Sequence, residues 1–140
     1  MKPEIAIRHG YQAEAHTVLT ADGYLLTLHR IPCSRKGCGG LRRGSGQPIF
    51  LQHGLLSSSA DWLLSGPEKA LAFILADLGY DVWLGNARGN TYSRHHINMS
   101  NNDAKYWDFS WHEMAQFDLP AEIDFIYNYR QSIYYPIFVN

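Results

Sequence analysis

The stretch PEKALAFILADLGYDVWLGNARGN, residues 67–90, predicts a helix followed directly by a buried strand. Residues 67–78 open with a proline, which suits a first helical turn, and continue in strong helix formers until Gly79 ends the helix. Tyr80–Leu84 then predicts a short apolar strand. Upstream, Ile49–Gln52 predicts another, of the kind buried on both faces of a parallel sheet. Strand, helix and strand with short links indicate a βαβ unit with a right-handed crossover, so the fold class is α/β.

The segment before this unit predicts a hairpin. Ala15–Thr20 and Tyr24–Ile31 have the composition of two strands, and Asp22-Gly23 between them supplies the positive φ angles that a tight turn needs. Residues 33–46 are dense in Gly and Arg and predict a connecting loop.

The segment after the unit predicts a long helical region. Residues 110–113, SWHE, have the S-x-x-E form of a capping box and should open a helix that runs to about residue 117. Asp118 is expected to act as the N-cap of a second start with Pro120 in its first turn, so a kink is predicted there. Residues 133–140 are strand-like apart from one proline.

Composition limits the possible functions. The chain has 140 residues, 46% of them hydrophobic, which is typical of one globular domain. A formal net charge of -1 argues against a nucleic-acid partner held by phosphate attraction. No apolar run is long enough for a secretory leader or a transmembrane helix. The two cysteines, Cys33 and Cys38, are compatible with either a small disulfide or two free thiols.

Two strand ends are the candidate sites, because ligands of α/β sheets bind at the carboxyl ends of strands. At the first, Gly54 would let the backbone approach a ligand, and the N–H groups after it could face a developing oxyanion. The alternative is that His53-Gly54 only turns the chain from strand to helix. At the second strand end, Arg88 is expected to anchor its own loop by donating to carbonyls or a carboxylate.

Other motifs in the sequence carry less information about function. None of the seven histidines has the spacing of a metal site, so no metal is expected. Ser57, Ser58 and Ser59 lie outside any G-x-S-x-G elbow, so nothing is expected to align their hydroxyls with a base. Asn98-Met99-Ser100 matches the N-glycosylation acceptor pattern, which also arises by chance.

The sequence resembles the acid lipases of gastric, lingual and lysosomal type and their insect relatives over residues 4 to 127. The matching segments are GY (10–11), EAHTV (14–18), TADGYLLTLHRIP (20–32), FLQHGLL (50–56) with Trp62, LAFILADLGYDVWLGNARGNT (71–91), FSWHEMA (109–115), DLPA (118–121) and IDFI (123–126). The resemblance implies an α/β-hydrolase fold and a serine ester hydrolase that acts on triacylglycerols or cholesteryl esters without a cofactor. It also implies a secreted or lysosomal location.

The resemblance assigns site residues as well. It implies that the backbone N–H of Leu55 is one oxyanion-hole donor, supported by His53 and Gly54. The nucleophile elbow of the family and its triad Asp and His have no counterpart in this sequence. We therefore expect residues 1–140 to form a partial hydrolase domain, with an N-terminal hairpin region over 1–32 and a divergent tail over 128–140, truncated before the nucleophile strand.

Two functional hypotheses follow. The first is the N-terminal part of a neutral-lipid ester hydrolase, inactive alone because the triad is missing. The second is a non-catalytic lipid-binding or interaction protein. In the family fold Ile49–Gln52 lies beside the nucleophile strand, so we expect its edge to be left unpaired and to favour aggregation or strand capture.

Overall fold

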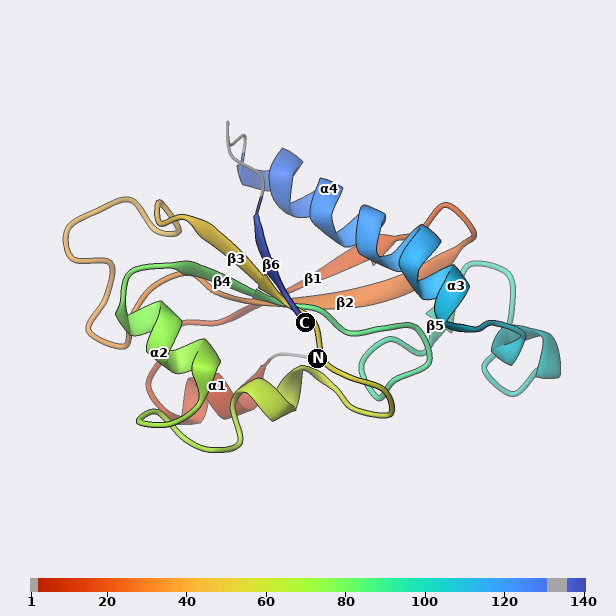
Figure 1. The fold of residues 1–140 in the computed structure, drawn as a ribbon, viewed down its shortest axis with the longest axis horizontal. Helices are drawn as coiled ribbons and strands as arrows, with labels where there is room; N and C mark the ends of the chain where they lie inside the picture. The colour runs from red at the N-terminus through yellow and green to blue at the C-terminus, as the bar shows by residue number, and fades with distance from the viewer. Residues whose placement is uncertain (1–2, 131–135) are drawn as a thin grey trace.

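A computed structural model describes residues 3–130 and 136–140 (Figure 1). Its sheet has the strand order β1-β2-β4-β3-β6, with the short β5 paired to β2. The strands are β1 Glu14–Leu19, β2 Tyr24–Ile31, β3 Pro48–Leu51, β4 Asp81–Leu84, β5 His95–His96 and β6 Ile137–Val139. The helices are α1 Glu4–Arg8, α2 Leu71–Asp77, α3 Trp111–Glu113 and α4 Leu119–Arg130, with 3₁₀ turns at Ser59–Trp62 and Ala104–Trp107. None of the helices in these two ranges is long and apolar enough to cross a bilayer.

The predicted hairpin is confirmed. β1 and β2 pair antiparallel, from Glu14 opposite Arg30 to Leu19 opposite Leu25. Only one residue of the expected Asp-Gly pair has a positive φ, namely Gly23 at 97°. Asp22 instead accepts a hydrogen bond from the Thr20 hydroxyl at 2.6 Å. The turn is therefore held by a side chain as well as by glycine.

The βαβ unit is also confirmed, since β3 and β4 pair in parallel. Its helix begins later than predicted, at Leu71 and not at Pro67. Gly66 has a φ of 79°, and its carbonyl accepts the N–H groups of Lys69 and Ala70, so residues 67–69 form a turn. Ala70 is extended and precedes the first helical residue. A turn that is hydrogen-bonded to the Gly66 carbonyl thus takes the place of the predicted first helical turn.

Helices cover both faces of the sheet. Figure 1 shows α4 on one face and α1 with α2 on the other. Side chains that alternate along β3 and β4 explain this arrangement. Ile49, Leu51 and Val82 pack toward the α1 and α2 side, whereas Phe50 and Trp83 pack in the cluster that contains residues of α4. Both faces of the central strands are therefore buried, as their continuous apolar sequence predicts.

The outer edge of β3 is paired, which contradicts the expectation of an open edge. β6 lies parallel to β3, with Ile49 opposite Ile137 and Leu51 opposite Val139. The Gln52 N–H donates to the Val139 carbonyl at 2.9 Å, and the Phe138 ring lies 5.6 Å from that of Phe50. The expectation was wrong because the apolar tail itself supplies a strand. β6 takes the place beside β3 at which the family resemblance puts the nucleophile strand.

The helical region after residue 110 begins as predicted. Glu113 accepts the Ser110 N–H at 2.7 Å, and the Ser110 hydroxyl accepts the His112 N–H at 3.2 Å, which completes the capping box. The second start is correct in position but not in its cap, because α4 begins at Leu119 with Pro120 in its first turn. Met114–Asp118 forms a π-helical turn, and Leu119 continues it in helical conformation. The Asp118 carboxylate does not cap the helix, because Arg88 binds it.

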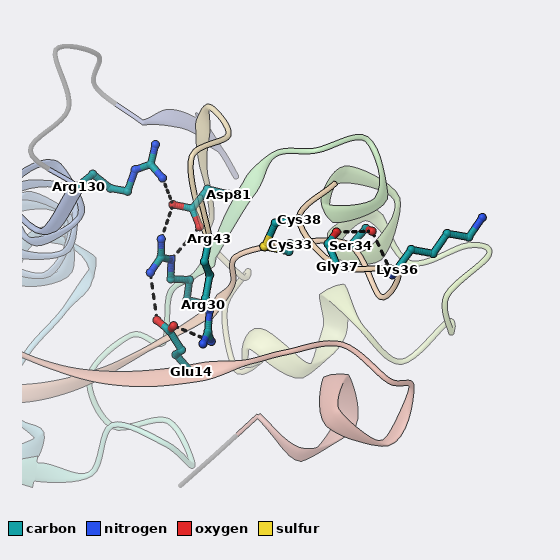
Figure 2. Close-up of a disulfide and its surroundings, with 10 residues drawn as sticks. All are labelled: Glu14, Arg30, Cys33, Ser34, Lys36, Gly37, Cys38, Arg43, Asp81 and Arg130. Atoms are coloured by element: carbon teal, nitrogen blue, oxygen red, sulfur yellow. Dashed lines mark hydrogen bonds and ion pairs between the residues drawn. A yellow bond between two sulfur atoms is a disulfide. The ribbon is translucent and has the colours of Figure 1, made fainter. Parts of the chain in front are cut away.

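The cysteine question is settled in favour of a disulfide. Cys33 and Cys38 are bonded, with their Cα atoms 5.0 Å apart (Figure 2). In the same loop the Ser34 hydroxyl donates to the Gly37 carbonyl at 3.0 Å. A crosslink over so short a loop stabilises the folded chain by about 2 kcal/mol.

A buried charge cluster beside this loop joins three strands and α4 (Figure 2). Arg30 on β2 donates to Asp81 on β4 at 2.8 Å and to Glu14 on β1 at 3.1 Å. Arg130 at the end of α4 approaches Asp81 to 3.1 Å. Burial acts to lower the pKa of Arg30, but the two carboxylates raise it overall. The cluster ties the last turn of α4 to the sheet.

Candidate functional site

The loops that follow β3 and β4 meet at one end of the sheet. His53, two residues after β3, joins them through its ring. Its Nε2 accepts the Ala87 N–H at 3.1 Å and lies 3.1 Å from the side-chain amide nitrogen of Asn90. Its Nδ1 lies 2.7 Å from the Gly54 carbonyl oxygen. Burial lowers the pKa of His53. The structure thus brings the two predicted strand ends into one site.

Residues 54–57 form a tight turn. The Ser57 N–H lies 3.4 Å from the Gly54 carbonyl oxygen, and Leu56 has a φ of 60°. Leu56 is the one non-glycine residue with positive φ in the described ranges, so Leu55 before it has a negative φ. These signs of φ are those of a type II turn with Leu55 in its first central position. A leucine at positive φ stores on the order of 1 kcal/mol of strain, and such strain is concentrated at functional sites.

The side chains of this turn face outward. Leu55 is 58% exposed and Leu56 is 98% exposed. Neither side chain contributes to the core. What the turn presents at a fixed position is therefore its backbone, including the Leu55 N–H.

Two asparagines that were not predicted as site residues hold the two loops together. Asn86 is fully buried, and its Oδ1 accepts the Ser59 N–H at 3.0 Å and the Asn90 side-chain amide at 2.9 Å. Its own amide donates to the Thr27 carbonyl at 2.9 Å. Asn90 in turn accepts the Tyr92 N–H at 2.9 Å. The sequence signal available was the pair of asparagines that flank Arg88.

Arg88 anchors the second loop to two other elements. It donates to Asp22 in the hairpin turn, at 2.6 and 2.9 Å, and to Asp118 in the π-helical turn, at 2.8 Å. Its guanidinium carbon lies 3.9 Å from the centroid of the Tyr24 ring. Burial acts to lower the pKa of Arg88, but the hydrogen bonds to the two carboxylates raise it overall.

The pKa values of the two carboxylates around Arg88 are shifted in opposite directions. Burial raises the pKa of Asp118, and its bonds to Arg88 only partly offset this effect. For Asp22 burial acts in the same direction, but the bonds to Arg88 and Thr20 prevail and lower its pKa. The difference follows from depth, because the Asp118 side chain is 3% exposed and that of Asp22 is 26% exposed.

Glu122 lies buried beneath the loop after β4. One of its carboxylate oxygens accepts the Asn86 N–H at 3.3 Å, and the other has no hydrogen-bond partner in the described part of the chain. Burial first and the charge of Asp118 second raise the pKa of Glu122 well above its ordinary value. Nothing in the local sequence distinguishes it from an exposed helical glutamate.

The serine run requires one correction. Ser57 donates to Asp61, and Ser58 accepts the Ala60 N–H at 3.3 Å, so both have local partners. The Ser59 hydroxyl, however, lies 3.0 Å from Nδ1 of His29, although no base was expected beside these hydroxyls. Ser59 is 1% exposed and His29 is 2% exposed. The pair is therefore shielded from solvent in this structure.

A cavity of about 630 Å³ opens beside the turn. It lies between the two strand-end loops and the start of the helical region after residue 110. Its apolar lining includes Leu55, Leu56, Trp107, Trp111 and Met114. Size and lining are those of a site for an apolar ligand of small-molecule size. Asn140, directly after β6, also lines the cavity.

Comparison with known proteins agrees with this geometry. Residues 2–66 match the family model of the partial alpha/beta-hydrolase lipase region. The chain is 49% identical to Lipase 1 of Drosophila melanogaster over 88% of its own length and 26% of that protein. It is 51% identical to human gastric triacylglycerol lipase over 84% of the chain and 29% of that protein. The chain therefore spans only about a quarter to a third of the length of these relatives.

A solved structure supports the fold. The structure of an esterase from Pyrococcus furiosus superposes on this chain with a TM-score of 0.57 and 15% sequence identity. The superposed region covers 90% of this chain and 38% of the esterase. At that identity the likeness concerns the fold alone. It agrees with the mixed sheet and the helices on both of its faces.

Proposed function

Because the chain belongs to the acid lipase family and matches its N-terminal portion, we propose that it supplies the oxyanion loop of a hydrolase that cleaves neutral-lipid esters. The observation that carries the proposal is the type II turn at the end of β3, which fixes the Leu55 backbone beside an apolar cavity. In α/β-hydrolases one oxyanion donor comes from the loop after this strand and the other from the residue after the nucleophile.

The test separates the Leu55 backbone from its side chain. Residues 1–127 are joined to the remaining C-terminal portion of human gastric triacylglycerol lipase, and kcat is measured on emulsified triacylglycerol. Leu55→Pro removes the N–H, and proline suits the first central position of a type II turn. We expect it to lower kcat by about 10²–10³. Leu55→Ala is the matched control and should leave kcat nearly unchanged. Unaltered kcat in Leu55→Pro would refute the assignment.

By itself, the 140-residue chain is proposed to be inactive. The sequence holds no G-x-S-x-G, and the Ser59 and His29 pair in the described part is buried. The purified chain should not hydrolyse a short-chain nitrophenyl ester above the buffer rate. A hydrolysis rate that a serine-directed inhibitor abolishes would contradict this.

The cavity favours a second candidate function, non-catalytic lipid binding. Two tryptophans, Trp107 and Trp111, line it and report directly on occupancy. Titration with a brominated long-chain fatty acid should quench their fluorescence saturably if the chain binds lipid. Trp107→Phe and Trp111→Phe identify the responding ring. Fluorescence that stays constant would exclude binding in this cavity.

A secreted or lysosomal location is proposed from the relatives and from two features of the chain. The Cys33–Cys38 bond is of the kind that persists in oxidising compartments. Asn98 is exposed in a bend and is open to glycosylation. When the chain is directed through a eukaryotic secretory pathway, an endoglycosidase should shift its mobility, and Asn98→Gln should abolish that shift. An unshifted wild-type chain would show that Asn98 is not modified.

A further inference from the structure

The two ring nitrogens of His53 have defined hydrogen-bonding roles. The Gly54 carbonyl can only accept, so Nδ1, 2.7 Å away, must carry a proton. The Ala87 N–H can only donate, so Nε2, 3.1 Å away, must be unprotonated. The Asn90 side-chain amide donates toward the same nitrogen at 3.1 Å. His53 is therefore neutral and in the Nδ1–H tautomer.

This tautomer bears on Leu55 through the intervening peptide group. The Gly54 carbonyl and the Leu55 N–H belong to one planar trans peptide, so they point in opposite directions. No described peptide bond is cis. A hydrogen bond that fixes the direction of the carbonyl consequently fixes the direction of the N–H. The Ser57 N–H approaches the same carbonyl to 3.4 Å and adds to this restraint.

We propose that His53 is a positioning residue whose Nδ1–H tautomer, selected by the Ala87 N–H of the neighbouring loop, sets the direction of the Leu55 N–H. The loop after β4 thereby controls the loop after β3. The purpose of this control rests on the proposed oxyanion role of Leu55. The tautomer and the peptide orientation do not, and they are measured without any ester hydrolysis, so the two ideas fail separately.

Protonation would disrupt the arrangement. A proton on Nε2 would face the N–H of Ala87 and the amide of Asn90, which are both donors. Burial lowers the pKa of His53, while its bond to Gly54 and the charge of Asp61, the carboxylate that acts on the ring, raise it in part. Burial prevails. The ring accordingly keeps its neutral form to a lower pH than an exposed histidine.

The first measurement is made on the wild-type chain. Nitrogen-15 spectra of the histidine rings, with the His53 signals identified by their loss in His53→Gln, should show a protonated Nδ1 and an unprotonated Nε2. The titration midpoint should lie below about 6.5, the ordinary value for histidine. A protonated Nε2 or a ring charged at neutral pH would overturn the proposal.

The second measurement separates positioning from space filling. In His53→Asn the side-chain amide can still donate near the Nδ1 position, whereas in His53→Gln it reaches the Nε2 position and can accept from Ala87. The Leu55 amide resonance should stay near its wild-type position in His53→Asn and move in His53→Gln. Exchange of the Ala87 N–H should accelerate about fivefold to tenfold in His53→Asn, because its acceptor is lost, and less in His53→Gln.

Equal responses of the Leu55 and Ala87 amides in the two variants would overturn the positioning role. Unfolding midpoints of both variants establish that they are folded under the conditions of measurement. If either variant does not fold, the ring tautomer of the wild-type chain decides the matter.

Discussion

At the residue scale, two glycines at the strand ends differ in how much space surrounds them. A Cβ on Gly85 would collide with the side-chain oxygen of Gln52 and would lie 2.8 Å from the ring of Phe50, which is fully buried. A Cβ on Gly54 would meet nothing within 4 Å, and the backbone there is not in the left-handed region. The two positions therefore make a matched pair.

We expect Gly85→Ala to lower the free energy of unfolding by about 1–3 kcal/mol, because the new methyl group overpacks the space beside Gln52 and Phe50. Gly54→Ala should change it by no more than about 0.5 kcal/mol. Urea titrations followed by tryptophan fluorescence measure both values. Equal losses of unfolding free energy in the two variants would show that these contacts do not restrict the side chain at position 85.

Single residues of the site could be predicted from the sequence where they directly follow an apolar strand. His53, Gly54 and Leu55 follow an apolar strand directly, so the rule that ligands bind at strand ends selects them. Asn86 also follows a strand end, but its contact with Glu122 joins residues that lie 36 positions apart in the chain. No local pattern carries such a contact. A buried glutamate and an exposed one look alike in sequence until the elements pack.

At the element scale, Arg88 joins the hairpin turn, the loop after β4 and the π-helical turn. Arg88→Met would keep most of the apolar stem but leave the buried Asp118 carboxylate without its cation. We expect a loss of about 3–5 kcal/mol in unfolding free energy at neutral pH. Arg42→Met at an exposed site is the control. The loss should shrink as the pH falls and Asp118 is protonated. A deficit that is independent of pH would contradict the charge argument.

The edge of β3 gives a second prediction at this scale. Deletion of residues 136–140 removes β6 and leaves the β3 backbone unpaired. We expect the shortened chain to self-associate, because an open apolar edge recruits other strands. Size-exclusion chromatography with light scattering measures this. Phe138→Val retains the strand and should have the same molar mass in solution as the wild-type chain. A shortened chain that self-associates no more than the wild-type chain would show that β6 does not protect the edge of β3.

Elements were predictable where the pattern was local. The hairpin and the βαβ unit follow from turn residues and apolar runs, and both are present. Two expectations failed where a distant partner prevailed. Asp118 has the local features of a helix cap, yet its carboxylate binds Arg88. The tail reads as a strand, but its pairing with β3 depends on chain topology, which residues 137–139 do not encode alone.

At the scale of the whole molecule, Glu122 makes stability depend on pH. Its pKa is raised in the folded state, mainly by burial. The contribution of such a group is fully present below its unfolded pKa, near 4.3, and is lost as the pH rises through its folded pKa. Within that window the loss has a slope of up to about 1.4 kcal/mol per pH unit.

Glu122→Gln should remove this slope and leave the chain more stable than wild type above the folded pKa. Unfolding free energies from urea titrations between about pH 4 and pH 8 supply the difference curve, in which the titrations of other groups cancel. Glu4→Gln, at an exposed helical site, is the control. Parallel curves for wild type and Glu122→Gln would rule out Glu122 as the source of this pH dependence.

The pairing of β6 with β3 also dictates an order of assembly. β1 and β2 are neighbours in the chain, whereas the residues that pair between β3 and β6 lie roughly ninety positions apart, and closing such a loop is entropically costly. Contacts of this separation form late in folding. Until β6 pairs with β3, the edge of β3 can pair with strands of other molecules. The yield of refolded chain therefore depends on protein concentration, even though the finished fold covers the edge that causes it.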